Sequence, residues 1–137
     1  MILLDSNVVI DLIDEDGPWV EWSRFALAES QARDSVAVSA VVCGETAARF
    51  ASLAEQSDFL DGLEISTIPL GSAAAFRAGT AYRDYRRRGG TRESILADFL
   101  IGGHAVDLAA ALITRDKGRF ASYFPELTLI TPETDHG

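Results

Sequence analysis

Short apolar runs alternate with helical stretches along the whole chain, and the connections between them are short. This alternation favours an α/β fold in which a parallel central sheet is covered by helices on both faces, giving three layers. The 137 residues suit a single domain, residues 1–131, followed by a short C-terminal tail at 132–137. The expected strands are residues 2–4, 35–38, 64–69, 110–114 and 127–131. The expected helices are residues 8–13, 19–33, 40–56, 57–63, 72–88, 95–106 and 117–123. Pro18 fits the first position of the second helix, the pair Gly89–Gly90 ends the fifth, and the expected caps are Ser39, Ser57 and Ser94.

Aspartates follow two of the expected strands. Asp5 comes directly after the first strand, and Asp116 follows the fourth. In parallel sheets covered by helices, functional groups gather beyond the carboxyl ends of the strands, which makes both residues candidates for a site. Both positions also suit the N-cap of the helix that follows, and Asn7 offers a second cap for the first helix. The sequence leaves the cap and the functional interpretations open.

Asp98 is the most informative acid, because its surroundings are apolar. The stretch from residue 95 to 101 is apolar nearly all round, which predicts a central, buried helix. A carboxylate in such a helix is normally paired or protonated. Gly102, one turn later, is expected to leave space beside Asp98. The alternative is a salt bridge to an arginine such as Arg92 or Arg115.

Two further residues complete the candidate set. Glu45 lies in the second turn of its expected helix, where a surface pair with Arg49 is the alternative, worth about 0.2–0.5 kcal/mol. Thr114 ends the fourth strand and is either a buried strand threonine or a hydrogen-bond donor to a ligand or neighbouring carboxylate.

Acids from four distant segments would thus lie near one edge of the sheet. Clustered carboxylates repel one another and raise each other's pKa values. One or two hard divalent ions, Mg²⁺ or Mn²⁺, remove that conflict, because they take oxygen ligands from carboxylates and water. Such ions activate water and neutralise charge on a phosphodiester, which is the chemistry this set of acids predicts.

The charge of the chain constrains its partners. A net charge of −9 and a pI of about 4.5 argue against nucleic-acid binding through a basic face alone. Either metal ions supply the positive charge, or the acidity serves solubility. A local basic patch is nevertheless present, and it either contacts a phosphate backbone or forms a solvated helix end that meets the helix dipole. Its members, around Gly89 and Gly90, are Arg83, Arg86, Arg87, Arg88 and Arg92.

The remaining signals concern location and other chemistry. Cys43 is the only cysteine, which excludes an intrachain disulfide, and its neighbours predict a small buried hydrophobe. The N-terminus lacks a basic leader, and charged residues interrupt the most apolar stretch, so we expect a cytoplasmic protein without a membrane span. Neither His104 nor His136 is placed for a general-base role. His104 falls on a different helix face from Asp98, which predicts a packed or hydrogen-bonded histidine.

Four segments together resemble the motifs of the PIN-domain family, and specifically of its VapC toxin branch. Nearly the whole chain is covered, in order and at the usual intervals, and Phe120 follows the last motif at a typical spacing. One departure is Ala97, where proline is frequent, and it affects helix entry and not a proposed ligand. The segments are residues 4–7 (LDSN), 39–45 (SAVVCGE), 95–105 (ILADFLIGGHA) and 112–116 (LITRD).

The resemblance implies a three-layer PIN-like fold and an endoribonuclease in which metal-activated water attacks an RNA phosphodiester. It further implies a homodimer and a cognate VapB-like antitoxin, and an antitoxin Arg or Lys that reaches the acids would compete for the charge site of the metal. The implied cofactor is Mg²⁺ or Mn²⁺, as one or two ions. The implied ligands are Asp5, Glu45, Asp98 and Asp116, with Thr114 and Asn7 assisting.

Three other kinds of function remain as alternatives. A PIN fold can serve as a non-catalytic RNA- or protein-binding module, but degenerate members lose acids and this chain keeps all four. An aspartate-nucleophile phosphatase would use Asp5, but Asn7 stands where such enzymes usually repeat an aspartate. A phospho-receiver domain carries paired acids after its first strand, and Ser6 is not acidic.

Overall fold

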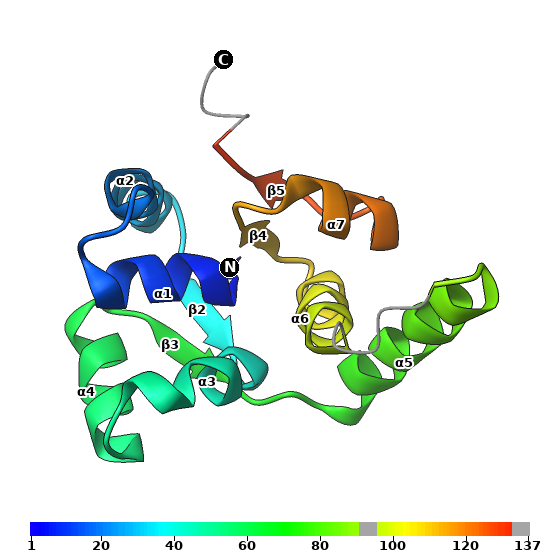
Figure 1. Ribbon diagram of the computed structural model, residues 1–137, viewed down its shortest axis with the longest axis horizontal. Coiled ribbons are helices and arrows are strands. Elements are labelled where there is room, and N and C mark those ends of the chain that lie inside the picture. Colours follow the sequence, from blue (N-terminus) through cyan, green and yellow to red (C-terminus); the bar gives the residue numbers. More distant parts are fainter. Residues whose placement is uncertain (91–95, 133–137) are drawn as a thin grey trace.

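A parallel, five-stranded sheet with the strand order β3-β2-β1-β4-β5 forms the centre of the computed structural model, which describes residues 1–90 and 96–132. Helices flank this sheet, as Figure 1 shows, and the α/β class and parallel sheet predicted from the sequence are confirmed. The strands are β1 (Ile2–Leu4), β2 (Val36–Ser39), β3 (Ser66–Ile68), β4 (Ala111–Ile113) and β5 (Leu129–Ile130). The α-helices of the described residues are α1 (Ser6–Asp14), α2 (Val20–Gln31), α3 (Ala40–Thr46), α4 (Leu53–Gly62), α5 (Ser72–Arg87), α6 (Leu96–Asp107) and α7 (Lys117–Tyr123).

The order in which strands are added to the sheet reverses at its middle strand, β1. The chain runs outward from β1 to β2 and β3, and then crosses back to add β4 and β5 on the other side of β1. Open parallel sheets bind ligands at the carboxyl ends of the strands where such a reversal occurs. The backbone N–H of Asp5 donates to the carbonyl of Ile113 at 2.9 Å, so β1 and β4 stay paired up to the candidate residues.

The central strands β1, β2 and β4 are largely buried on both faces, which explains why they are continuous apolar runs, whereas the edge strands β3 and β5 are more exposed. Leu3 and Leu4 in β1 and Leu112 and Ile113 in β4 are fully buried. An all-parallel sheet needs a layer of helices over each face, and the helices that flank this sheet form that cover. The helix α6 carries the fully buried Phe99 within this core, so the prediction of a central apolar helix is confirmed.

Two adjacent glycines in α6 permit close packing on different sides. A Cβ at Gly103 would lie 3.1 Å from the Cα of Ala78, so this glycine lets α5 approach α6 closely. A Cβ at Gly102 would lie 2.4 Å from the ring of Phe124. The expectation that Gly102 leaves space beside Asp98 was therefore wrong, because the ring that follows α7 fills that space.

The predicted helix 40–56 is wrong as one element. It ends with α3 and a 3-10 turn (Ala47–Arg49), after which Phe50 adopts an extended backbone with φ −125° and ψ 150°. Ser52, and not Ser57, caps the next helix, since its side chain accepts from the backbone N–H of Glu55 at 3.1 Å. The Glu55 carboxylate accepts in return from the N–H of residue 51 at 3.3 Å. This pattern is a variant of the capping box, in which the second donor is the residue before the cap, and it starts a separate helix, α4.

Smaller differences concern element ends and burial. Pro18 lies in the turn before α2 and not at its first position, since Trp19 occupies the N-cap. Cys43 is half-buried and not buried, with its Sγ 3.7 Å from Thr67 Oγ1. The left-handed Gly89, at φ 92°, ends α5 as the glycine pair predicted.

The described helices include none with the length and apolarity needed to cross a bilayer. Ser94, expected as a helix cap, lies outside the described residues, and so do residues 133–137 of the tail with His136.

Candidate functional site

Asp5 stands where β1 ends, with both carboxylate oxygens engaged. Its Oδ1 accepts from the backbone N–H of Ser6 at 2.8 Å, so Asp5 caps α1 as one interpretation predicted. Its Oδ2 accepts from the hydroxyl of Thr114 at 2.7 Å. The side chain therefore caps a helix and is tied to β4 at the same time, so the cap does not remove it from the site.

Thr114 links two of the predicted acids. Its hydroxyl donates to Asp5 and accepts from the backbone N–H of Asp116 at 3.0 Å. Asp116 in turn caps α7 by accepting from the backbone N–H of Arg119 at 3.2 Å. The predicted contact between Thr114 and a neighbouring carboxylate is confirmed, and the fully buried hydroxyl fixes the geometry between β1 and β4.

Glu45 reaches the same region from α3. The hydroxyl of Ser6 donates to Glu45 Oε1 at 2.5 Å, which connects α3 to the first turn of α1. Arg49 forms its ion pair with Asp14, so the alternative pairing of Glu45 with Arg49 was wrong. The sequence treated Ser6 only as part of a motif, whereas its side chain holds one of the four acids.

Arg119 is the residue that sequence reasoning missed. Its Nη1 donates to Asp98 Oδ2 at 2.7 Å, and its Nη2 lies 2.8 Å from Asp116 Oδ2. The predicted partners of Asp98 were Arg92 and Arg115. Arg115 pairs elsewhere, and Arg92 lies outside the described residues.

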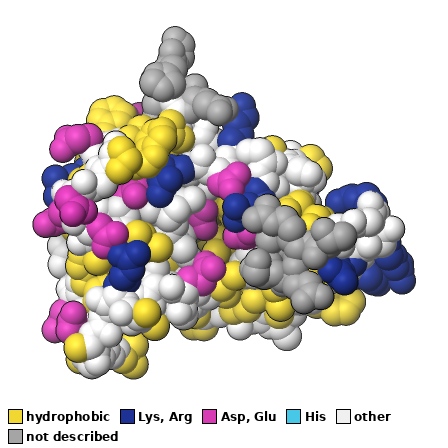
Figure 2. All heavy atoms as spheres, in the orientation of Figure 1, with side chains coloured by type: hydrophobic (Ala, Val, Ile, Leu, Met, Phe, Trp, Pro, Cys, Tyr) yellow, Lys and Arg dark blue, Asp and Glu magenta, His cyan; other side chains and the backbone are white. Residues whose placement is uncertain are grey.

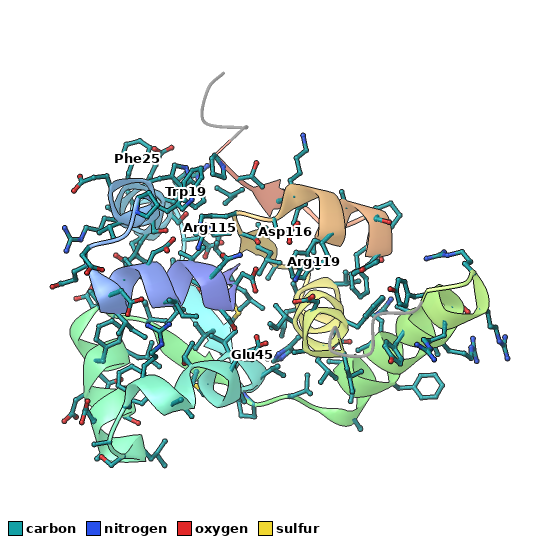
Figure 3. All side chains as sticks on the ribbon, in the orientation of Figure 1. Trp19, Phe25, Glu45, Arg115, Asp116 and Arg119 are labelled. Carbon is teal, nitrogen blue, oxygen red and sulfur yellow. The ribbon has the colours of Figure 1, made fainter. Side chains whose placement is uncertain are left out.

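A signal for Arg119 was present in the sequence. Arg119 stands three residues after Asp116, a spacing at which side chains meet on a helix. In Figure 3, Asp116 and Arg119 lie next to each other above α6, and Glu45 from α3 lies to the left of that helix.

The charges of these side chains are coupled. Asp5 is 5% exposed, and its burial raises its pKa to about 6. The hydrogen bonds from Thr114 and Ser6 oppose this rise, whereas the negative charges of Asp98 and Glu45 add to it. The carboxylates of Asp98 on α6 and Glu45 on α3 therefore lie close enough to repel that of Asp5 at the end of β1.

Arg119 responds to the same field. Burial by itself would lower the pKa of its guanidinium. The hydrogen bond and the charge of Asp98, together with the charges of Asp116 and Asp5, outweigh burial and raise that pKa. Four carboxylates thus form one group, the acid cluster: Asp5, Glu45, Asp98 and Asp116.

The donor set fits a hard divalent cation. The candidate ligands Asp5, Glu45, Asp98, Asp116 and Thr114 all offer carboxylate or hydroxyl oxygens, and a single guanidinium bonds two of the four carboxylates, which leaves surplus negative charge. The carboxylates are bonded to other side chains of the protein: Asp98 and Asp116 to Arg119, and Glu45 to Ser6. Accordingly, no three His, Cys, Asp or Glu side chains within residues 1–90 and 96–132 are already grouped as an ion would require.

A second ionic cluster lies next to the acid cluster. The guanidinium of Arg115 bonds both oxygens of Asp11, at 2.9 and 3.2 Å, and the hydroxyl of Ser23 donates to Asp11 at 2.7 Å. The guanidinium carbon lies 5.6 Å from the centre of the Trp19 ring. Asn7, the other predicted assisting residue, accepts from the backbone N–H of Arg115 at 3.4 Å. These contacts hold the loop between Thr114 and Asp116.

Two further predictions concern residues away from the acids. His104 is buried, and its Nδ1 lies 2.8 Å from Ser39 Oγ, which confirms a hydrogen-bonded histidine, with a pKa lowered by burial.

The described arginines of the basic patch are exposed at the end of α5. Figure 2 shows that patch at one end of the molecule, with acidic side chains nearer the middle of the same face.

Comparisons with known proteins agree with the fold. The sequence profile described as PIN domain matches residues 2–123. Similar solved structures include VapBC2 from Rickettsia felis bound to a DNA fragment from their promoter, with a TM-score of 0.72, 20% identity, and coverage of 96% of this chain and 98% of that chain. A toxin–antitoxin complex from Klebsiella pneumoniae gives a TM-score of 0.69 at 23% identity with the same coverage. DNA-bound VapBC from Salmonella typhimurium gives 0.69 at 20% identity, again over 96% and 98%. No curated protein sequence matches.

Proposed function

The chain belongs to the PIN domain family, and from that premise we propose that it is an endoribonuclease that requires Mg²⁺ or Mn²⁺. The observation that carries the proposal is that the charges of Asp98 and Glu45 act on the carboxylate of Asp5. Asp5 lies at the carboxyl end of β1, the strand at which the order of the sheet reverses. The buried Asp5 is repelled there by the negative charges of Asp98 and Glu45, and the only guanidinium bonded to the acid cluster among the described residues is that of Arg119, on Asp98 and Asp116. Such a set is costly unless it serves to attract a cation.

Each acid has a distinct role in this proposal. Asp5 and Asp98 are the principal ligands, because they are the two buried acids of the cluster. Glu45, which is exposed, ligates the ion or orients water, and Asp116 serves a second ion or acts through water. A bound divalent ion would supply positive charge beside the phosphodiester and lower the pKa of water.

The chain's own hydroxyl groups orient the ligands. Thr114 and the N–H of Ser6 each occupy one lone pair on a different oxygen of Asp5, which fixes the plane of that carboxylate. The Ser6 hydroxyl does the same for one oxygen of Glu45. Partners of this kind hold metal ligands in place and are as necessary as the ligands themselves.

RNA is the proposed substrate, and the basic patch is the proposed contact for its backbone. The net charge of −9 would repel a polyanion, so local cations must offset it. Replacing Arg86, Arg87 and Arg88 with alanine should weaken RNA binding and reduce its dependence on salt. Unchanged affinity and unchanged salt dependence would remove the patch from the proposal. The full patch is Arg83, Arg86, Arg87, Arg88 and Arg92.

We further propose that the protein is the toxin of a VapBC-type pair. The similar structures are described as VapBC and toxin–antitoxin complexes, which supports a VapB-like antitoxin as partner. A basic side chain of that antitoxin would inhibit by bonding the acid cluster, and the toxin would act as a homodimer in the cytoplasm. Expression without an antitoxin should arrest growth, and Asp98→Asn should relieve the arrest.

A second candidate is a non-catalytic PIN-fold module that binds RNA or protein. It would need no ion, and the retention of all four acids disfavours it. The decisive experiment measures cleavage of RNA with Mg²⁺ or Mn²⁺, with chelator, and with Asp98→Asn. Asp61→Asn is the matched control, because Asp61 is an exposed acid on α4.

Cleavage should require the ion, disappear in Asp98→Asn and persist in Asp61→Asn. Cleavage that survives both chelator and Asp98→Asn would contradict the mechanism. A protein that neither cleaves RNA nor binds a divalent ion would favour the binding module.

A further inference from the structure

Arg119 places its guanidinium between two of the acids. Its Nη1 bonds Asp98 on α6, and its Nη2 bonds Asp116 at the start of α7. The side chain of Asp98 is only 12% exposed and that of Arg119 is 31% exposed, so this contact is largely shielded from water. Charge-assisted hydrogen bonds in such surroundings are among the stronger contacts of a protein.

The bonding pattern shows which oxygens are already used. Asp116 Oδ1 accepts from the backbone N–H of Arg119, and Oδ2 bonds its guanidinium. On Asp98, Oδ2 bonds the guanidinium. A planar guanidinium can serve two carboxylates from two helices at once, which a lysine ammonium on a flexible stem does less well. An ion that takes both oxygens of Asp98 together with Asp116 has therefore to displace or share these bonds.

We infer that Arg119 is a built-in counter-cation, which competes with a divalent ion for Asp98 and Asp116. The inference rests on the proposed metal-dependent function and deepens it. Arg119 stabilises the acid cluster in the absence of the ion and thereby lowers the affinity for the ion. When an ion binds, the guanidinium of Arg119 leaves Asp98, while the backbone N–H of Arg119 still donates to Asp116. The released guanidinium therefore stays beside the site, where it can face a phosphate oxygen.

The surrounding charges distinguish this role from that of an ordinary ion pair. An ordinary pair joins one arginine to one acid, and nothing is gained by separating the two. Arg119 is drawn by Asp98, Asp116 and Asp5 together, and the repulsion among the acids remains after it has bonded two of them. A doubly charged ion offsets that repulsion better than a single guanidinium does, so exchange is favourable.

Calorimetric titration with Mn²⁺ alone, without RNA, tests the inference on four proteins. They are the wild type, Arg119→Gln, Arg119→Lys and the control Arg24→Gln. Arg24 is a half-exposed arginine that pairs with Glu15 and Glu21, so its loss changes the net charge equally. We expect Arg119→Gln to bind Mn²⁺ about tenfold more tightly, the effect of losing one charged hydrogen-bonded competitor. Arg119→Lys should lie between Arg119→Gln and the wild type, and Arg24→Gln should match the wild type.

Thermal unfolding provides the second readout. Without ion, Arg119→Gln should have a lower melting temperature than the wild type, because the acids lose their counter-cation. Mn²⁺ should raise the melting temperature of Arg119→Gln by more than it raises that of the wild type. The lysine variant keeps a charge, so it carries the test if the glutamine variant does not fold.

Equal or weaker Mn²⁺ affinity in both Arg119 variants would overturn the inference and leave the metal proposal standing. Absence of Mn²⁺ binding in every protein, including the wild type, would overturn both.

Discussion

Two arginines four residues apart, Arg115 and Arg119, build two ionic clusters that differ in their balance of charge. Arg115 meets one acid, Asp11, whose two oxygens also receive the buried hydroxyl of Ser23. Arg119 meets two acids directly, and two more belong to the same cluster. The first cluster is neutral, and the second keeps an excess of negative charge.

The difference teaches how to separate a structural ion pair from a site. Both clusters are partly buried, and both contain short contacts, so neither burial nor distance distinguishes them. A buried pair of matched charges stabilises a fold only modestly, but breaking it leaves a charge without a partner. Surplus charge of one sign destabilises the fold without a ligand and is retained where it binds one. We therefore assign structure to the Arg115 cluster and function to the acid cluster.

The largest contrast should appear in catalysis. Asp98→Asn should lower RNA cleavage on the order of a thousandfold, roughly 4 kcal/mol of activation free energy, because it removes a principal ligand of the ion. Asp11→Asn should change the rate by less than about threefold if its cluster is purely structural. Rates of cleavage at saturating Mn²⁺ measure both. An equal loss of activity in the two variants would erase the distinction between the clusters.

Stability should show the opposite order. Asp11→Ala should lower the free energy of unfolding by about 2–3 kcal/mol, since Arg115 and the buried Ser23 lose their shared acceptor. Asp98→Ala should cost less than about 1 kcal/mol without ion, because the repulsion of Asp5 that it relieves offsets the lost bond to Arg119. Urea unfolding with chelator present measures both. A larger loss in Asp98→Ala would show that the acid cluster is also structural.

A smaller effect concerns pH in the absence of ions. The pKa of Asp5 is about 6 in the folded protein, against 3.8 as the reference value, so the folded state retains a proton that the unfolded chain releases. Its contribution therefore makes stability fall as pH rises from about 4 to about 6. Asp5→Asn should remove that slope, as followed by urea unfolding across this range.

Thr114→Val sharpens the same test. The hydroxyl of Thr114 is the strongest of the influences that lower the pKa of Asp5, so its loss should extend the slope to higher pH. Identical slopes in the wild type, Asp5→Asn and Thr114→Val would assign the pH dependence to other groups.

Much of the fold was accessible from the sequence for a physical reason. Parallel strands buried on both faces, such as β1 and β4, have to be apolar runs, and an aspartate such as Asp5 directly after one stands out. The cap at Ser39 was readable too, because its side chain accepts from the N–H of Val41 at 3.3 Å.

Features that depend on tertiary distance were missed. The choice among Arg92, Arg115 and Arg119 as partner of Asp98 depends on how α7 packs beside α6, which no local pattern fixes. Gly102 serves Phe124 for the same reason, since only the fold brings that ring to the helix. The break before α4 is different, because the Ser52 capping box was a local signal that the helical pattern obscured.

Crystals grown with Mn²⁺ give the most direct test of whether the acid cluster holds an ion. Anomalous diffraction locates manganese independently of the protein model. We predict a peak coordinated by Asp5 and Asp98, with the guanidinium of Arg119 moved off Asp98. No peak at these carboxylates at saturating Mn²⁺, or a peak only elsewhere, with Arg119 still bonded to Asp98 and Asp116, would contradict the account.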